Sequence, residues 1–406
     1  MDTTDIRGFN YLPSSARNDV EFWRDYDRAL IERELAYAQR LNLNLARVFL
    51  SYVVYEREQE EFLSKLQHFV STAWSLGIAT LPVVWDSCFD EVQPTYDADS
   101  SMWVSNPGTE QWGEHFYPKG EVYCAALVHA LRSNDGLYGW DVMNEPTSNI
   151  SIWYAPEEEK EARLEKLWSF VGHFCDVLRE TDSSAQLTCG VAEVAEIPRI
   201  VDKLDFISFH DYSPSRSAIR ETVRQAQEYG EQYGKPILCT EMGCLARSNP
   251  YDMCIELYRE LGVGFVIWEL MIGCSMFPDI HGVVYGDGTV RDPSIAAALL
   301  GFYRNRSASA ITSFVNKENH STKVIVEAKS LLSEEVNPYD PQEYIDRLLL
   351  CAETIANELE AGELVPMMSL PSSKVLAMQK DCKEIPPAKA VLKELCELLM
   401  NATHIL

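Results

Sequence analysis

The stretch FISFHDYSPSRSAIRETVRQAQEYGEQYGKPILCTE, residues 206–241, decides the fold because it contains one complete strand–helix–strand unit. Residues 206–210 and 236–241 are short, mostly apolar runs, which are typical of strands buried in a parallel sheet. A helical pattern near residues 216–233 joins them. Each run ends in a polar side chain, His210 in the first and Glu241 in the second. The unit therefore predicts parallel strands that are joined by helices.

The same alternation extends in both directions, from the N-terminus to about residue 305. Strand-like runs lie at 8–11, 46–50, 78–85, 137–144, 186–190 and 264–268, and amphipathic helical patterns separate them. Eight strands, each followed by a helix, predict an α/β fold, the (β/α)8 TIM barrel, over residues 1–305. No GxGxxG follows the first strand, which weakens the alternative of a doubly wound dinucleotide-binding sheet.

Residues 306–406 predict a helical C-terminal extension that packs on the barrel. Asp340, Pro341 and Glu343 match the start of a helix, with an N-cap, a proline in the first turn and a capping glutamate. Gly362 suits the end of that helix, and the pair Pro386-Pro387 opens a final one. These helices could shape the mouth of the barrel, form a homo-oligomer or only cover the barrel.

The net charge narrows the class of binding partner, and the cysteine content indicates the cellular compartment. Asp and Glu number 62 against 35 Lys and Arg, so the formal net charge of -27 predicts no nucleic-acid partner and no anionic membrane surface. The 11 cysteines include no CxxC pair, which favours reduced thiols in a cytoplasmic protein. The N-terminal residues have neither the basic nor the apolar region of a signal peptide, which also predicts a cytoplasmic location.

Polar and aromatic side chains gather at the ends of the predicted strands. The active site of a TIM barrel lies at the carboxyl ends of its strands, whatever the reaction. Strands four and seven face each other across that mouth, so Glu145 and Glu241 could flank one sugar bond. The candidates, in chain order, are Arg47, Asn144, Glu145, His210, Tyr212, Glu241 and Trp268. Singly, His210, Trp268 and Arg47 could equally be core residues.

Four segments together resemble clan A of the glycoside hydrolases, most nearly the family 5 cellulase- and mannanase-like group. They are Trp140-Asp141-Val142-Met143-Asn144-Glu145-Pro146, Asp205-Phe206-Ile207-Ser208-Phe209-His210-Asp211-Tyr212, Lys235-Pro236-Ile237-Leu238-Cys239-Thr240-Glu241-Met242-Gly243 and Phe265-Val266-Ile267-Trp268. They occur in the family's order, and the resemblance covers about residues 7–303. The resemblance implies a retaining glycosidase in which Glu145 is the acid/base and Glu241 the nucleophile.

The resemblance also implies roles for the other strand-end residues. Asn144 would bind the sugar 2-hydroxyl and Trp268 would form a platform under the −1 sugar. Tyr212 would donate a hydrogen bond to the nucleophile, His210 would line the same site, and Arg47 would be the cation beneath the nucleophile that keeps it ionised.

One position departs from the family pattern. Many members carry a histidine just after the third strand, where this chain has Val84-Trp85-Asp86-Ser87. Trp85 or Asp86 must occupy that place, and Asp86 could bind a sugar hydroxyl directly. The loop 88–118 that follows is rich in aromatic residues and could wall the pocket, which would favour an exo-acting enzyme.

The sequence therefore predicts a retaining β-glycoside hydrolase that acts on small oligosaccharides or glycosides. No HExxH or similar ligand pair occurs, so no metal and no cofactor are expected. A transglycosidase that uses the same residues is the first alternative. A non-catalytic barrel that binds carbohydrate or a protein partner is the second.

Overall fold

The computed structural model describes residues 2–90, 93–97, 102–302, 320–334, 341–361, 375–379 and 382–403. The chain divides into two compact units, Met1–Tyr303 and Arg304–Leu406. The boundary lies within two residues of the predicted one at 305. Each unit is described separately below.

The first unit is a closed barrel of eight parallel strands in the order β1 to β8. This confirms the predicted (β/α)8 fold. The strands are β1 Arg7–Tyr11, β2 Leu45–Phe49, β3 Ala79–Asp86, β4 Trp140–Asn144, β5 Leu187–Val191, β6 Ile207–His210, β7 Ile237–Met242 and β8 Gly264–Ile267. A short two-stranded sheet, β9 Met271–Ile272 with β10 Val284–Tyr285, follows the barrel strands.

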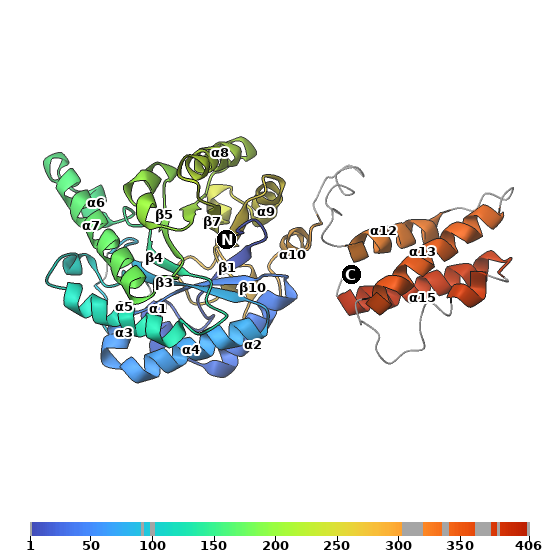
Figure 1. The fold of residues 1–406 in the computed structure, drawn as a ribbon, viewed down its shortest axis with the longest axis horizontal. Coiled ribbons are helices and arrows are strands. Elements are labelled where there is room, and N and C mark those ends of the chain that lie inside the picture. The colour runs from blue at the N-terminus through green and yellow to red at the C-terminus, as the bar shows by residue number, and fades with distance from the viewer. Residues whose placement is uncertain are drawn as a thin grey trace. The chain divides into compact units, whose positions relative to one another are not determined.

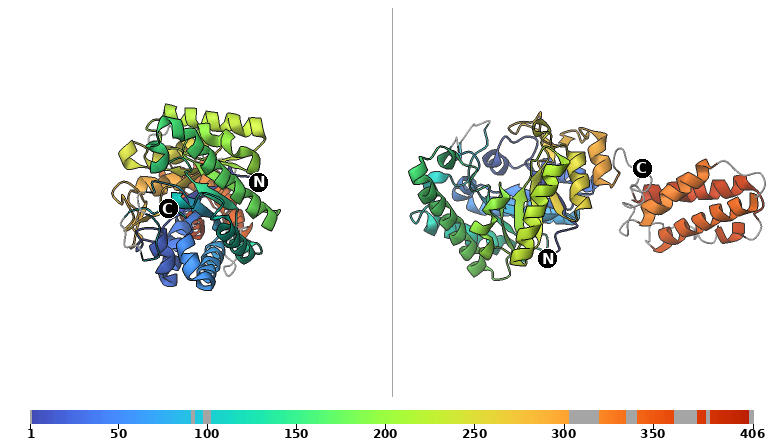
Figure 2. Two further views of the ribbon diagram at one scale, coloured as in Figure 1. Left: turned by 90° about the vertical axis from the view of Figure 1, so that its left-hand side faces the viewer. Right: turned by 90° about the horizontal axis from the view of Figure 1, so that it is seen from above.

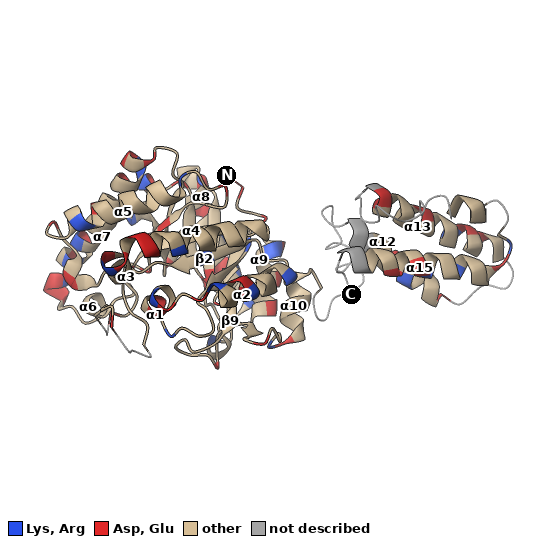
Figure 3. Cartoon of the chain, turned by 90° about the horizontal axis from the view of Figure 1, so that it is seen from below, with Lys and Arg blue, Asp and Glu red and all other residues tan. Residues whose placement is uncertain are grey.

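Helices surround the strands (Figures 1 and 2). The longer ones are α2 Arg28–Arg40, α4 Gln59–Ser75, α5 Tyr117–Leu131, α7 Glu157–Thr181, α8 Arg216–Tyr233, α9 Tyr251–Glu260 and α10 Pro293–Leu299. Shorter helices, α1 Asp19–Arg24, α3 Tyr52–Arg57 and α6 Ile150–Trp153, lie in the connections. On the outer helices acidic and basic residues are interspersed (Figure 3), and several form ion pairs such as Arg163–Glu159.

Two apolar layers hold the barrel together. The larger one lies between the strands and the helices, where apolar faces of both elements are excluded from water. The smaller one fills the barrel interior near the strand starts and includes Leu45, Leu81, Phe206, Leu238 and Val266. The interior near the strand ends is left to the polar residues described below.

Among its described residues, the second unit includes the helices α12 His320–Ser333, α13 Pro341–Ala361 and α15 Ile385–Thr403, which pack on one another. Their buried residues form a core of their own, with Leu348, Ile355 and Leu392 fully excluded from solvent. The start of α13 at Pro341 confirms the prediction from the capping pattern. Asp340 and Gly362 lie outside the described residues, and the packing of these helices on the barrel stays a prediction. In the described part of the chain, no helix is both long and apolar enough to cross a bilayer.

Candidate functional site

Strand register brings the predicted residues together at the carboxyl ends of the strands. Asn10 of β1 pairs with Arg47 of β2, and Asn144 of β4 pairs with Gly190 of β5. His210 of β6 lies opposite Glu241 of β7. The register shifts just before these last two pairs, in β4 and in β7. Neighbouring strands therefore contribute side chains to one site, as expected for a parallel barrel.

Arg47 is the centre of a buried hydrogen-bond network. Its guanidinium is fully excluded from solvent and donates to Asp141 Oδ2 at 2.9 Å, Asn10 Oδ1 at 2.8 Å and Glu241 Oε1 at 2.8 Å. A fourth bond goes to Asn144 Oδ1 at 2.7 Å. Burial lowers the pKa of Arg47, but the charges of Asp141 and Glu241 outweigh burial and raise it. The network fixes a positive charge directly beside Glu241.

Glu241 is buried and has donors on both carboxylate oxygens. Arg47 donates to Oε1, and the Tyr212 hydroxyl donates to Oε2 at 2.9 Å. Burial raises the pKa of Glu241, whereas the charges of His210 and Arg47 act to lower it. The net pKa is raised from its usual value. Two donors on one carboxylate favour its ionised form and fix its orientation.

Glu145 follows the last residue of β4 and adopts a positive φ of 40°. Its backbone N–H donates to the carbonyl of Gly190 at 2.7 Å, which helps to hold this strained conformation. His210 Nδ1 lies 2.7 Å from Oε1, and the Cys88 thiol donates to Oε2 at 3.2 Å. Burial raises the pKa of Glu145, but the hydrogen bond and charge of His210 outweigh it and bring the value to about 2.

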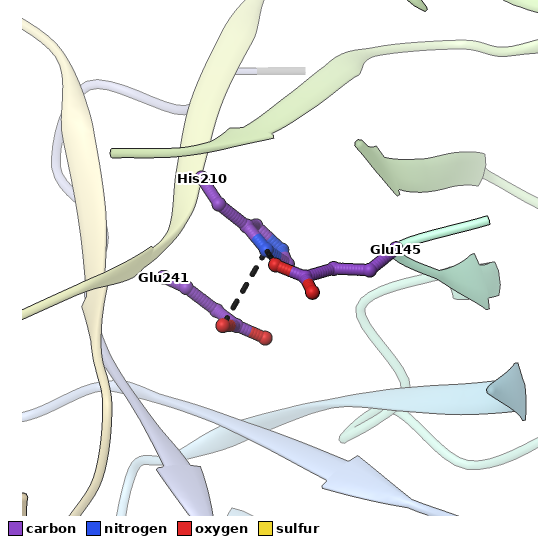
Figure 4. Close-up of side chains that lie close together, drawn as sticks. All are labelled: Glu145, His210 and Glu241. Carbon is purple, nitrogen blue, oxygen red and sulfur yellow. Dashed lines mark hydrogen bonds and ion pairs between the residues drawn. The ribbon is translucent and has the colours of Figure 1, made fainter. Parts of the chain in front are cut away.

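His210 lies between the two glutamates (Figure 4). Its Nδ1 is 2.7 Å from Glu145 Oε1 and 3.4 Å from Glu241 Oε2. Both neighbours of Nδ1 are acceptors, so Nδ1 carries a proton. Nε2 is buried and has no hydrogen-bond partner in the described part of the chain. One potential ligand atom from each of these three side chains lies within 4.8 Å of the other two, so among the described residues this group could hold a cation.

Two hollows meet at Glu145. The inner cavity has a volume of about 340 Å³, and the outer hollow has a volume of about 560 Å³. Glu241, Asn144 and Trp268 line only the inner cavity, and His210 lines only the outer hollow. Glu145, Phe89, Tyr212 and Arg247 line both.

The family is established by sequence comparison. The model of the Cellulase family, described as glycosyl hydrolase family 5, matches residues 36–272. The chain belongs to this family. It is therefore a glycosidase, and the matched segment of this family 5 chain includes every predicted site residue. No curated protein sequence matches the chain closely enough to be reported.

Solved structures share the fold of this family 5 chain at low sequence identity. One is the exo-beta-1,4-mannosidase Op5Man5 from Opitutaceae bacterium strain TAV5, with a TM-score of 0.55, 16% identity and coverage of 86% of this chain and 75% of that one. Another is a GH5_18 variant from Streptomyces cattleya in complex with Manb1-4GlcNAc, with a TM-score of 0.55, 13% identity and coverage of 84% and 95%. The endo-1,4-beta-mannanase from Rhizomucor miehei has a TM-score of 0.54 at 12% identity, with coverage of 77% and 95%.

The structure separates Trp85 from Asp86, between which the sequence could not choose. Trp85 is 0% exposed and packs among aromatic rings of the outer layer, including Phe174 at 5.0 Å between ring centroids. It lines neither hollow, so the prediction that it contacts substrate is wrong. Successive side chains of a strand point to opposite faces, and Trp85 is on the helix-facing side.

Asp86 points into the barrel but does not line either hollow. Its Oδ1 accepts from Asn144 Nδ2 at 2.9 Å and from the backbone N–H of Cys88 at 3.0 Å, and Trp103 Nε1 donates to Oδ2. Burial raises the pKa of Asp86 to about 7, against these hydrogen bonds. Asp86 therefore orients Asn144, and a direct bond from Asp86 to a sugar hydroxyl is not what this geometry favours. One N–H of the Asn144 amide stays available to a ligand.

Sequence reasoning missed four polar groups of the site. Asn10 and Asp141 anchor Arg47, Cys88 contacts Glu145, and Glu269 lines the inner cavity. Asp141 could have been predicted from the sequence, because a carboxylate inside an apolar strand requires a buried cation as its partner. From the aromatic loop 88–118, Trp103 and Phe89 reach the inner cavity, whereas Trp112 does not line it and His115 is exposed.

Proposed function

We propose that this chain is a retaining β-glycoside hydrolase that cleaves small oligosaccharides or glycosides by double displacement. Glu241 would be the nucleophile and Glu145 the general acid/base. The observation that carries the proposal is the closeness of the two carboxyl groups, since one oxygen of Glu145 lies within 4.8 Å of one oxygen of Glu241. Retaining enzymes keep their carboxyl groups about 5–5.5 Å apart, and inverting enzymes about 6.5–9.5 Å apart. The short separation supports retention.

The hydrogen-bond partners support the division of roles. Arg47 and Tyr212 both donate to Glu241, which favours the anion that must attack the anomeric carbon. No other side chain among the described residues receives this pair of donors. The pKa of Glu241 is raised above its ordinary value of 4.5, and the nucleophile must be ionised to attack. The fall of kcat/KM at acidic pH should therefore have its midpoint above pH 4.5.

Glu145 must be protonated when it donates to the leaving oxygen. The low pKa of Glu145 comes from the hydrogen bond and the charge of His210, which outweigh burial. A sugar that fills the cavity expels water, which disfavours the ionised carboxylate and raises its pKa. Substrate binding would therefore favour the protonated form of Glu145. After Glu241 has formed the glycosyl-enzyme, Glu145 would deprotonate the attacking water.

The two hollows support a small substrate. The nucleophile, Asn144 and the Trp268 ring line the inner cavity, which we assign to the glycone. Its volume of about 340 Å³ is at the lower end of the range for ligand sites, about 300–1,000 Å³. The leaving group would occupy the outer hollow, where Trp153 and Phe89 offer aromatic faces beside Glu145. A compact glycone cavity, partly walled by Trp103, supports exo action.

We propose that the enzyme acts in the cytoplasm. All eleven cysteines are free, and most of them are buried. Such a set of thiols is typical of a reducing compartment. Substrates would then be sugars small enough to be imported.

The test uses aryl β-glycosides of glucose, galactose, mannose and xylose, with β-mannosides tried first because two of the similar structures are named for β-mannoside cleavage. Glu145→Gln and Glu241→Gln should each lower kcat by at least roughly 10³-fold on substrates with poor leaving groups. A good leaving group needs no proton, so Glu145→Gln should regain its first step on a dinitrophenyl glycoside. Glu241→Gln should not.

Product stereochemistry gives an independent readout. NMR of the wild-type reaction should show the β-anomer first, because two displacements retain configuration. Glu180→Gln, an exposed position on α7, is the matched control and should keep full activity. Wild-type rates in both site variants, or release of the α-anomer first, would rule out the proposal. An added acceptor sugar separates the alternatives, because a transglycosidase would elongate it.

A further inference from the structure

A third carboxyl group, Glu269, lies in the inner cavity with Glu145 and Glu241. It follows Trp268 directly, just beyond the end of β8. Its residue is only 3% exposed. The mechanism proposed above does not use it, and neither the strand-end pattern nor the family resemblance singled it out.

The partners of Glu269 are few. The Ser275 hydroxyl donates to Oε1 at 2.8 Å. Across the described residues, Oε2 has no hydrogen-bond partner, and no Lys or Arg forms an ion pair with this carboxyl. This differs from Glu241, whose two oxygens are both bound by protein donors. Oε2 therefore keeps a hydrogen-bonding capacity that a ligand in the cavity can satisfy.

The chemistry of Glu269 indicates the kind of ligand atom. Burial raises the pKa of Glu269 to about 8, and the negative charge of Glu241 adds to the effect. A neutral carboxyl group offers one O–H donor as well as acceptor oxygens. A sugar hydroxyl has the complementary set, one donor and two acceptor lone pairs. An ammonium group of an amino sugar would instead need an ionised carboxylate.

We propose that Glu269 is a specificity-determining residue that binds one hydroxyl group of the glycone through Oε2, while Ser275 holds the carboxyl in place. The inference rests on the proposed glycosidase function, because it assigns the inner cavity to the glycone. Asn144 is expected to contact the 2-hydroxyl from the end of β4, so Glu269, which follows β8 beside the strand of Glu241, would bind a different hydroxyl.

The experiment combines Glu269→Ala with monodeoxy versions of the best aryl β-glycoside. On the parent substrate, Glu269→Ala should lower kcat/KM roughly 10- to 100-fold, the usual effect of leaving a buried ligand hydroxyl unpaired. On the one deoxy substrate that lacks the contacted hydroxyl, the variant and the wild type should have nearly equal kcat/KM. The 2-deoxy substrate should retain the full penalty. Glu269→Gln keeps a donor and an acceptor and should lose less than the alanine variant.

Two further variants keep the inference falsifiable. Ser275→Ala removes the anchor but not the carboxyl, so it should show a smaller loss with the same hydroxyl dependence. If Glu269→Ala does not fold, as judged by circular dichroism, Glu269→Leu fills the space and gives the same comparison. An equal penalty on every deoxy substrate, or no penalty on the parent, would overturn the inference. A wild-type enzyme that cleaves no aryl β-glycoside would instead overturn the proposed function.

Discussion

At the scale of single residues, Glu269 couples the stability of the barrel to pH. Burial raises its pKa from the usual 4.5 to about 8. Between these values the folded chain keeps a proton that the unfolded chain has released, so stability falls as the pH rises from about 4.5 to about 8. Glu269→Gln cannot ionise and should exceed the wild type in free energy of unfolding at pH 8 by about 1–3 kcal/mol.

Denaturant unfolding at pH 4.5 and pH 8 measures this effect. The advantage of Glu269→Gln should shrink toward pH 4.5, where both chains are largely neutral at this position in the folded state. Glu180→Gln, which makes the same substitution at an exposed position on α7, is the matched control. A stability difference that is the same at both pH values would contradict the assignment of a raised pKa to Glu269.

The sequence predicted the residues that end strands better than those that support them. Glu145, Glu241, Asn144, His210, Tyr212 and Trp268 stand at or just beyond strand ends, where barrel topology alone places a site. Trp85 was a wrong candidate because period-two alternation decides which of two neighbours faces inward, and the exact end of β3 was not known. Cys88 and Glu269 come from loops, whose paths the pattern of apolar residues does not determine.

At the scale of secondary structure elements, β5 contributes Gly190, whose lack of a side chain leaves room for neighbouring groups of the site. A Cβ atom at Gly190 would lie 2.9 Å from Arg47 Nη2, 3.0 Å from His210 Nε2 and 3.1 Å from Asp141 Oδ2. Arg47 is held by four partners and cannot move away easily. Gly190→Ala should therefore displace the groups that hold Glu241 and Glu145. Overpacking of this kind costs about 1–3 kcal/mol, and we expect kcat/KM to fall by roughly 10- to 100-fold.

Gly172→Ala on α7 is the matched control for this substitution. Its added Cβ would meet only the flexible end of Lys203, at 3.3 Å. Because alanine favours a helix over glycine, this variant should be as stable as the wild type or more stable, with full activity. Kinetic constants and melting temperatures of both variants make the comparison. Full activity in Gly190→Ala would show that the Arg47 network tolerates a shift.

The element pattern was predictable where elements are long and periodic. All eight barrel strands and the main helices follow from runs of apolar residues and from spacings of three and four. The helices α1, α3 and α6 were missed because four to six residues make too few turns to show a period. Helix α12 was also not predicted, although its neighbour α13 was recognised by its capping residues.

At the scale of the whole molecule, the pattern of elements indicated two regions but not the relation between them. The change of pattern near residue 305 predicted a second region, and the structure divides the chain after Tyr303. The site residues all lie before that point, and His281 is the last residue that lines the inner cavity. The barrel has its own apolar layers, and the described buried residues of the second unit, from Val324 onward, form a separate core within that unit. Each unit thus has the buried core that independent folding requires.

Separate cores predict two thermal transitions in the full chain. Scanning calorimetry should resolve a second transition with an unfolding enthalpy of about 70 kcal/mol, the usual value for about 100 residues. A chain that ends at Tyr303 should lose that transition and keep the other, and its kcat/KM on aryl glycosides should not change measurably, because the described site residues all precede Tyr303. If truncation instead lowered the melting temperature of the barrel and its activity together, the C-terminal helices would have to support the barrel directly, as the sequence pattern predicts for a packed extension.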